Sequence, residues 1–338
     1  MMKKMIALLL ALLMAVGMLA GCSKQNDDDT DDATDKLSIV TTIFPEYDWV
    51  KAVLGDKAEH ADITMLLDNG VDLHSYQPTA DDIVKISDCD LFLYVGGESE
   101  GWVEKALKNS TNKDRKVINL LDVLGDSVKH EEVVEGMQEE EHEHEDADEH
   151  GDGEEHEHEE ESDEHVWLSL KNAEVLVGAI SNALQELDAE NKEIYAANAD
   201  AYMKKLSALD AEYQTAVDNA SCKTVLFGDR FPFRYLVDDY GLNYYAAFVG
   251  CSAETEASFE TVSFLAKKAD ELNLPCVLTI ESKHHKIAET IVKNTAQKSQ
   301  KILTMDSMQS TTSKDVASGT TYLSVMEKNL AVLKEALA

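Results

Sequence analysis

The side chains of this sequence best suited to bind a metal ion are concentrated in one stretch. Seven of the eleven histidines lie within residues 130–165, and residues 131–164 hold twenty Asp or Glu with no Lys or Arg. Neutral imidazole suits Zn²⁺, Cu²⁺, Ni²⁺ and Fe²⁺, and dense carboxylate raises the local concentration of any cation. Histidine alternates with acid twice, which favours the collection of divalent metal ions. The alternating histidines are His142, His144, His156 and His158.

A long run of like charge also has a simpler interpretation, as a solvated segment without metal. Residues 130–164 contain almost no apolar side chains to offset the entropy of ordering. We therefore expect a disordered insertion within a folded domain. Disorder alone does not require histidine to alternate with acid, so metal binding remains the favoured role.

The N-terminal residues have the features of an export signal. Lys3 and Lys4 precede an apolar run of fifteen residues, Ile6–Ala20, which is short for a membrane-spanning helix of about twenty residues. The run ends in Leu-Ala-Gly-Cys, which resembles the bacterial lipobox, in which the cysteine is lipidated. We expect a signal peptide at 1–21, lipidation at Cys22, and a polar tether at 22–35. The protein is then extracytoplasmic and anchored to the cell membrane.

Charge and cysteine spacing exclude several classes of protein. The net charge is −36, of which the acidic stretch contributes −20 and the six aspartates of the tether −6. The remainder is only mildly acidic and has no basic stripe, so we expect no nucleic-acid partner. The other cysteines form no CxxC pair and are expected to be buried free thiols. They are Cys89, Cys222, Cys251 and Cys276.

Strand and helix patterns alternate through both halves of the chain. This predicts an α/β fold with two similar parallel-sheet lobes. The lobes are expected at 36–170, including the insertion, and at 220–338. Between them, residues 171–219 are nearly free of Gly and Pro, which predicts connector helices at 170–187 and 192–219. The second is expected to be a long rigid connector between the lobes, with a packed helical hairpin as the alternative. The expected strands are 37–44, 61–67, 91–95, 117–121, 224–227, 244–249, 276–280 and 302–305.

Four candidate ligands follow expected strands or the insertion. His74 lies in a polar turn after the second strand, and His165 stands where the acidic stretch returns to apolar sequence. Asp229 and Asp306 follow the first and last strands of the second lobe. Because ligands bind at the carboxyl ends of parallel strands, two imidazoles and two carboxylates are expected to close a four-ligand site.

Several short segments carry a family resemblance that covers nearly all of the mature chain. The sequence resembles the zinc/manganese ABC-transporter substrate-binding lipoproteins, and among them the zinc members, which carry an acidic His-rich loop in the same place. No single segment is decisive, but their order and spacing are specific. The segments are Ile43–Asp48, Gly70–Thr79, His165–Leu168, Tyr235–Leu236, Tyr240–Leu242 and Tyr322–Leu330.

The resemblance implies two lobes, joined by a long helix, that move little on binding. It implies that His74 and His165 are ligands and that Asp306 matches the family's carboxylate. The family's third ligand aligns with Arg230, which cannot bind a cation because it is permanently protonated. Asp229, its neighbour, is the expected substitute, with Glu281 or a histidine of the acidic stretch as alternatives.

The function implied is capture of Zn²⁺, with Mn²⁺ possible, by a monomer that delivers the ion to an ABC permease. The acidic stretch would act as a scavenger that raises the metal concentration near the site. A surface adhesin or a storage lipoprotein not coupled to transport is the alternative. An enzyme is not expected, because the sequence contains neither an HExxH pair nor a GxSxG nucleophile elbow.

Overall fold

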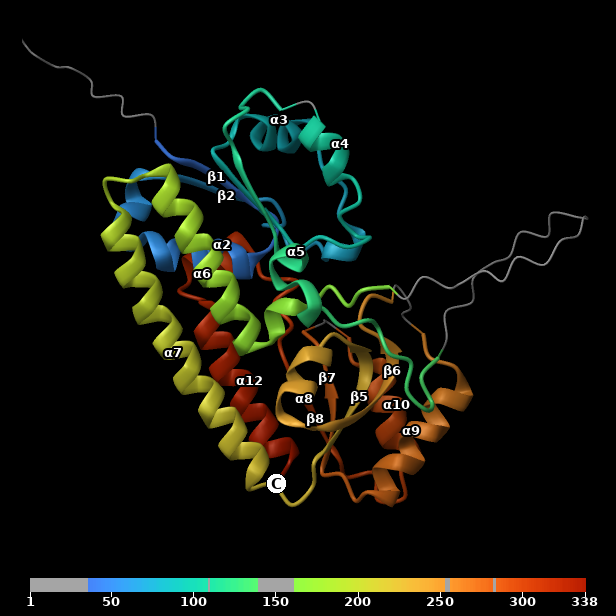
Figure 1. The fold of residues 1–338 in the computed structure, drawn as a ribbon. Helices are drawn as coiled ribbons and strands as arrows, with labels where there is room; N and C mark the ends of the chain where they lie inside the picture. Colours follow the sequence, from blue (N-terminus) through green and yellow to red (C-terminus); the bar gives the residue numbers. More distant parts are fainter. Residues whose placement is uncertain (1–35, 109, 139–160, 253–255, 282–283) are drawn as a thin grey trace, which may run out of the picture. The chain divides into compact units, whose positions relative to one another are not determined.

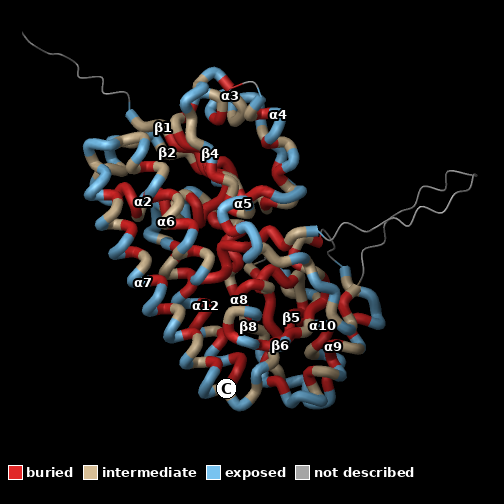
Figure 2. The backbone as a smooth tube through the Cα atoms, viewed as in Figure 1, coloured by how far each residue is buried: buried red, intermediate tan, exposed pale blue. Residues whose placement is uncertain are grey.

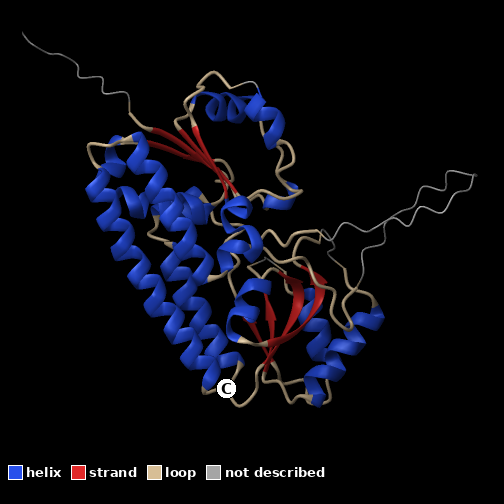
Figure 3. Ribbon diagram, viewed as in Figure 1, coloured by secondary structure: helices blue, strands red, loops and turns tan. Residues whose placement is uncertain are grey.

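The computed structural model describes residues 36–108, 110–138, 161–252, 256–281 and 284–338. Residues 37–338 form one compact unit, which contains two four-stranded parallel sheets (Figures 1 and 3). The first sheet comprises β1 (Ser38–Thr41), β2 (Asp62–Met65), β3 (Leu91–Tyr94) and β4 (Lys116–Asn119). The second comprises β5 (Thr224–Phe231), β6 (Asn243–Val249), β7 (Cys276–Thr279) and β8 (Lys301–Thr304).

The two sheets have the same topology. Their strand orders are β2-β1-β3-β4 and β6-β5-β7-β8, and all neighbouring strands are parallel. The first three residues of β3 and all four of β7 are buried, as expected for strands covered on both faces. The predicted pair of similar parallel-sheet α/β lobes is therefore confirmed.

The helices connect and cover the strands. In the first lobe they are α2 (Phe44–Leu54), α3 (Ala80–Asp88), α4 (Val103–Lys108) and α5 (Leu120–Leu124). In the second they are α8 (Arg234–Tyr240), α9 (Phe259–Glu271), α10 (Lys286–Asn294), α11 (Ser313–Ala317) and α12 (Tyr322–Ala336). The strand expected at 117–121 ends at Asn119, because the Asn119 side chain accepts a hydrogen bond from the Asp122 amide and caps α5.

The connector consists of two helices that pack as an antiparallel hairpin, the arrangement that the sequence left as the alternative. They are α6 (Leu170–Leu187) and α7 (Lys192–Asp218), which lie side by side in Figure 1. The Ser181 hydroxyl donates to the Tyr195 carbonyl, and the Ser207 hydroxyl donates to Glu174. At 1.5 Å per residue α7 is about 40 Å long. It also packs against α2 of the first lobe and α12, which follows the second sheet.

The two lobes share one hydrophobic core. A single cluster of buried side chains extends from β1 and β3 through α6, α7 and α12 to β5, and residues coloured as buried run through both sheets in Figure 2. At its centre Trp49 and Tyr322 meet edge to face, with ring centroids 5.1 Å apart. A smaller cluster lies between the second sheet and helices α9 and α10. A continuous core of this kind holds the loops that follow the strands of both lobes in fixed positions.

The two ends of the acidic stretch pair with each other where they leave the folded unit. His130 forms an antiparallel bridge with Ser162, and the Asp163 amide donates to the Lys129 carbonyl at 2.8 Å. Beyond this stem, on the side of the second lobe, the Gln138 amide donates to the Ala247 carbonyl of β6. The predicted metal-collecting histidines and Cys22 lie outside the described residues. Among the described helices, none is long and apolar enough to span a membrane.

Candidate metal site

His74 lies in a short 3-10 helix, Leu73–Ser75, in the loop that follows β2. Its amide donates to Asp72 Oδ1 at 3.0 Å, which fixes the turn. Its ring Nδ1 is 2.8 Å from Ser99 Oγ and 3.4 Å from Glu164 Oε2. Because these partners hold Nδ1, Nε2 is the nitrogen left to bind a metal ion.

The Glu164 carboxylate lies beside the His74 ring, and its surroundings favour its charged form. Burial raises its pKa, but hydrogen bonds with His74 and with Ser99 outweigh burial, so the pKa lies below its ordinary value. Its Oε1 accepts the Ser99 amide at 2.9 Å, and its buried Oε2 lies 3.4 Å from His74 Nδ1. An anionic oxygen in this position strengthens His74 as a ligand, because it stabilises positive charge that develops on the ring.

His165 is completely buried. Asp163 Oδ1 lies 3.0 Å from its ring Nδ1 and also accepts its amide at 2.9 Å. Burial lowers the pKa of His165, and Asp163 more than compensates, so the pKa lies above its ordinary value. The ring packs against Gly250, where an added Cβ would stand 2.9 Å from His165 Cε1. Glycine at position 250 therefore makes room for the imidazole.

The two predicted imidazole ligands meet. His74 Nε2 and His165 Nε2 are 3.1 Å apart, and the ring centroids are 5.1 Å apart. Two nitrogens bound to one tetrahedral zinc ion at 2.0–2.1 Å stand roughly 3.3 Å apart, so little movement is needed to admit the ion. Each ring has a carboxylate on its other nitrogen, an arrangement that is typical of metal-binding histidines.

Cys251 is the third potential ligand at this place, and the sequence interpretation missed it. One ring nitrogen of each histidine and Cys251 Sγ all lie within 4.8 Å of one another. Cys251 follows β6, and Glu131 Oε1 in the stem of the acidic stretch accepts its amide at 2.9 Å. Burial and then Glu131 raise the pKa of its thiol far above the ordinary value. A metal ion bound to Sγ must therefore displace a proton.

The carboxylates predicted to complete the shell lie outside this group of three. Asp229 accepts the amide of Arg230 at 2.9 Å, and Asp306 accepts the amide of Met308 at 2.8 Å. Glu281 accepts the amides of Ser307 and Gln309 at 2.6 and 3.1 Å. Each carboxylate is thus bound by a nearby backbone amide. Their roles as ligands remain predictions, and so does the predicted role of the acidic stretch.

Arg230, which stands where the resemblance expects a ligand, connects the two loops around the site. It lies near the end of β5, after an irregularity in the pairing of β5 with β6. One guanidinium nitrogen is 2.6 Å from Asp72 Oδ2, and another donates to the Ser252 carbonyl at 3.3 Å. Arg230 therefore joins the loop of His74 to the loop of Cys251.

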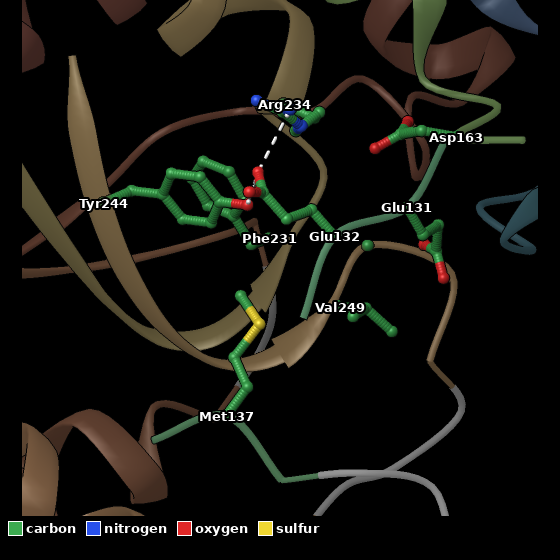
Figure 4. A pocket seen from close by; sticks show the side chains of 9 residues that line it. Glu131, Glu132, Met137, Asp163, Phe231, Arg234, Tyr244 and Val249 are labelled. Carbon is green, nitrogen blue, oxygen red and sulfur yellow. Dashed lines mark hydrogen bonds and ion pairs between the residues drawn. The ribbon is translucent and has the colours of Figure 1, made fainter. Parts of the chain in front are cut away.

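A small pocket beside the site shows how acidic the surroundings are (Figure 4). Glu131 and Asp163, the carboxylates that hold Cys251 and His165, both line it. Across the pocket, Arg234 is paired with Glu132 at 3.1 Å. Glu131 and Asp163 on this side, and Glu164 beside the His74 ring, place negative charge next to the two imidazoles, while Arg234 and Arg230 are each paired with another carboxylate, Glu132 and Asp72.

Comparisons with known proteins identify the family of the chain. The family model described as the periplasmic zinc-uptake complex component A matches residues 39–336. The chain is 34% identical over 300 residues to the zinc-binding lipoprotein AdcA of Streptococcus pneumoniae, covering 89% of this chain and 56% of that protein. It thus spans about half the length of that relative. It is 33% identical over 303 residues to the high-affinity zinc uptake system protein ZnuA of Bacillus subtilis, covering 90% and 88%.

Solved structures of zinc-binding proteins also match the chain. The Zn(II)-bound ZnuA-like domain of Streptococcus pneumoniae AdcA superposes with a TM-score of 0.67 at 30% identity, covering 89% of this chain and 99% of that domain. The match extends from β1 to the end of α12, so it includes both lobes and the residues of the candidate metal site. The chain therefore belongs to the family of the periplasmic zinc-uptake complex component A.

Proposed function

We propose that this protein is an extracytoplasmic solute-binding lipoprotein that captures Zn²⁺ and delivers it to an ABC permease. The observation that carries the proposal is the pair of imidazole nitrogens 3.1 Å apart, each ring held by a carboxylate through its other nitrogen. The named zinc proteins among its relatives support the choice of metal. The work of such a protein is binding and release, so no catalytic step is included.

The ligand chemistry favours zinc over manganese. Imidazole suits Zn²⁺, whereas Mn²⁺ prefers carboxylate, carbonyl and water oxygens. The three groups that meet in the site are two imidazoles and a thiol, and the carboxylates around them are engaged with imidazole nitrogens or backbone amides. Manganese remains the alternative cargo, to be decided by competition between the two ions.

The acidic stretch is proposed to act as a scavenger that delivers ions to the tight site. Its stem supplies Glu131 and Asp163, which hold Cys251 and His165, so the stretch begins and ends beside the proposed ligands. A weak site tethered this close raises the effective concentration of metal at the tight one. The proposed signal peptide at 1–21 would direct export, and the proposed lipid on Cys22 would keep the protein at the membrane surface.

The test is zinc affinity measured by competition with a chelating dye, which separates a tight site from the weaker stretch. Wild-type protein should hold one zinc ion tightly, and His74→Ala should lose that ion while keeping the weak sites. His60→Ala is the matched control, because His60 is exposed and lies just before β2, at its amino end. A His74→Ala protein with unchanged tight binding would refute the proposed site.

Delivery to a permease is tested in cells. A deletion strain should grow poorly in chelated medium, should recover with added zinc, and should recover with the wild-type gene but not with His74→Ala. A deletion strain that grows normally under chelation would point to an adhesin or a storage protein instead.

A further inference from the structure

The position of Cys251 in the fold is equivalent to the position that supplies a ligand in the other lobe. β2 and β6 occupy the same place in the two sheet orders, each at an edge and each the second strand of its lobe. The loop after β2 carries His74, and the loop after β6 carries Cys251. Both residues therefore leave the carboxyl end of corresponding strands, where α/β sheets bind their ligands.

The loop of Cys251 is held firmly on both sides of the cysteine. Gly250 packs under the His165 ring, and Glu131 accepts the Cys251 amide at 2.9 Å. On the other side, Ser252 is almost completely buried and accepts a hydrogen bond from Arg230. A ligand must be held within about 0.5 Å of its productive position, and these contacts provide such restraint.

Arg230 has a role consistent with this placement. The resemblance puts a metal ligand at position 230, and an arginine there removes one donor from the site. The same guanidinium binds Asp72, two residues before His74, and the carbonyl of Ser252, next to Cys251. The substitution thus takes away one ligand and fixes the loop that offers another.

We propose that the Cys251 thiolate is the third protein ligand of the captured ion, beside His74 and His165, and that it makes the site selective for Zn²⁺ over Mn²⁺. The inference rests on the proposed function. On binding, a metal–sulfur bond forms and the S–H proton passes to solvent. A zinc ion bound to sulfur at 2.3 Å and to nitrogen at 2.0–2.1 Å puts these atoms roughly 3.6 Å apart. The three candidate atoms lie within 4.8 Å of one another, so binding the ion would draw them closer together.

A thiolate is a soft ligand, so it prefers metal ions that bind sulfur well. Zn²⁺, Cd²⁺ and Co²⁺ bind sulfur well, whereas Mn²⁺ is bound best by oxygen ligands. The proposal therefore predicts that Zn²⁺ excludes Mn²⁺ more strongly from the wild-type site than from Cys251→Asp, which offers an oxygen in place of sulfur.

The experiment uses the chain from Ser23 onward, which contains the entire compact unit, with Co²⁺ as a spectroscopic probe for zinc. One equivalent of Co²⁺ should produce the intense near-ultraviolet sulfur-to-cobalt charge-transfer band together with the visible bands of tetrahedral cobalt. Cys251→Ser should lose the charge-transfer band and bind zinc at least about 100-fold more weakly, since even the loss of a group that only supports a metal ligand weakens binding 10–100-fold. Cys251→His should recover most of the affinity without the band.

Cys222→Ser is the matched control. Cys222 is also a partly buried free thiol, but it precedes β5 and so lies at the opposite end of the second sheet. It should keep both the band and the affinity. Thermal unfolding of each variant without metal confirms that it is folded before binding is compared.

The outcomes separate this inference from the proposed function. If wild-type protein binds Co²⁺ tightly through His74 but shows no charge-transfer band, or if Cys251→Ser keeps its zinc affinity, the thiolate ligand is refuted and metal capture stands. If wild-type protein has no tight site that depends on His74, the proposed function itself fails.

Discussion

The carboxylate of Asp163 provides the sharpest test of how the proposed site is built, because it contacts the ring of the proposed ligand His165. Its Oδ1 is 3.0 Å from His165 Nδ1 and 2.9 Å from the His165 amide. It holds the ring with Nε2 toward His74 and makes the imidazole a stronger donor. Asp163→Asn keeps an oxygen for the hydrogen bonds but removes the charge, and Asp163→Ala removes both.

The expected effect follows from these contacts. Loss of a carboxylate that supports a metal-binding histidine typically weakens binding 10–100-fold, which is about 1.4–2.7 kcal/mol. The loss of zinc affinity in Asp163→Asn should be near 10-fold, because the orientation of the His165 ring is kept. The loss in Asp163→Ala should be near 100-fold, because the ring can also turn. Zinc affinity measured by competition with a chelating dye, at fixed pH and ionic strength, resolves both changes.

A matched control separates support of the ligand from general destabilisation. Asp48 is a largely buried carboxylate that accepts the Tyr322 amide at 2.9 Å at the start of α12, and it has no contact with the candidate ligands. Asp48→Asn should lower thermal stability and leave zinc affinity unchanged. If Asp163→Ala bound zinc as tightly as wild type, or if Asp48→Asn weakened binding equally, the assigned role of Asp163 would be wrong.

Three further outcomes are expected. Gly250→Ala places a Cβ 2.9 Å from the His165 ring and 3.0 Å from the Phe231 carbonyl, so zinc affinity in the dye assay should fall by more than about 10-fold. The control is Gly178→Ala in α6, where the added Cβ meets nothing within 4 Å and should raise thermal stability slightly. Burial raises the pKa of Glu46 from 4.5 to about 8, so the folded state keeps a proton that the unfolded state loses. Stability measured by urea unfolding should therefore fall as pH rises from about 4.5 to about 8, and Glu46→Gln should flatten that decline. Zinc at about 100 times its dissociation constant should stabilise the folded state by about 2.7 kcal/mol in the same assay, and removal of zinc by a chelator should reverse the gain; an equal gain in His74→Ala would count against the site.

Much of the fold could be predicted from sequence because its strands are short apolar runs separated by helical patterns. The eight expected strands all occur, and their bounds differ by a few residues, as at β5, which continues to Phe231. The pairing of α6 with α7 could not be decided from sequence. A helix with apolar residues on one face packs equally well on a lobe or on another helix.

The candidate site was predicted in part. His74 was selected because it stands in a Gly- and Asp-rich turn, where a core histidine is not expected. His165 was selected because the apolar Val166 and Trp167 beside it should hold its ring in a defined rotamer. Asp306 follows β8 as expected, whereas Asp229 lies within β5, which continues to Phe231. Position along a strand does not determine where a side chain points. Both are bound by backbone amides close to them in sequence.

Cys251 was missed for a different reason. The strand-end argument that selected the two aspartates applies equally to Gly250-Cys251, which follows β6. A lone cysteine is usually a buried, inert thiol, so its position at the end of a strand was not taken as a sign of metal binding. Only the folded structure shows that Cys251 lies beside two imidazoles, those of His74 in the loop after β2 and of His165.

The most direct measurement is a crystal structure of the protein purified without chelators, with anomalous diffraction recorded on both sides of the zinc absorption edge. The account predicts one strong zinc peak within bonding distance of His74 Nε2 and His165 Nε2. A folded, zinc-loaded protein with no peak between these two rings would contradict it.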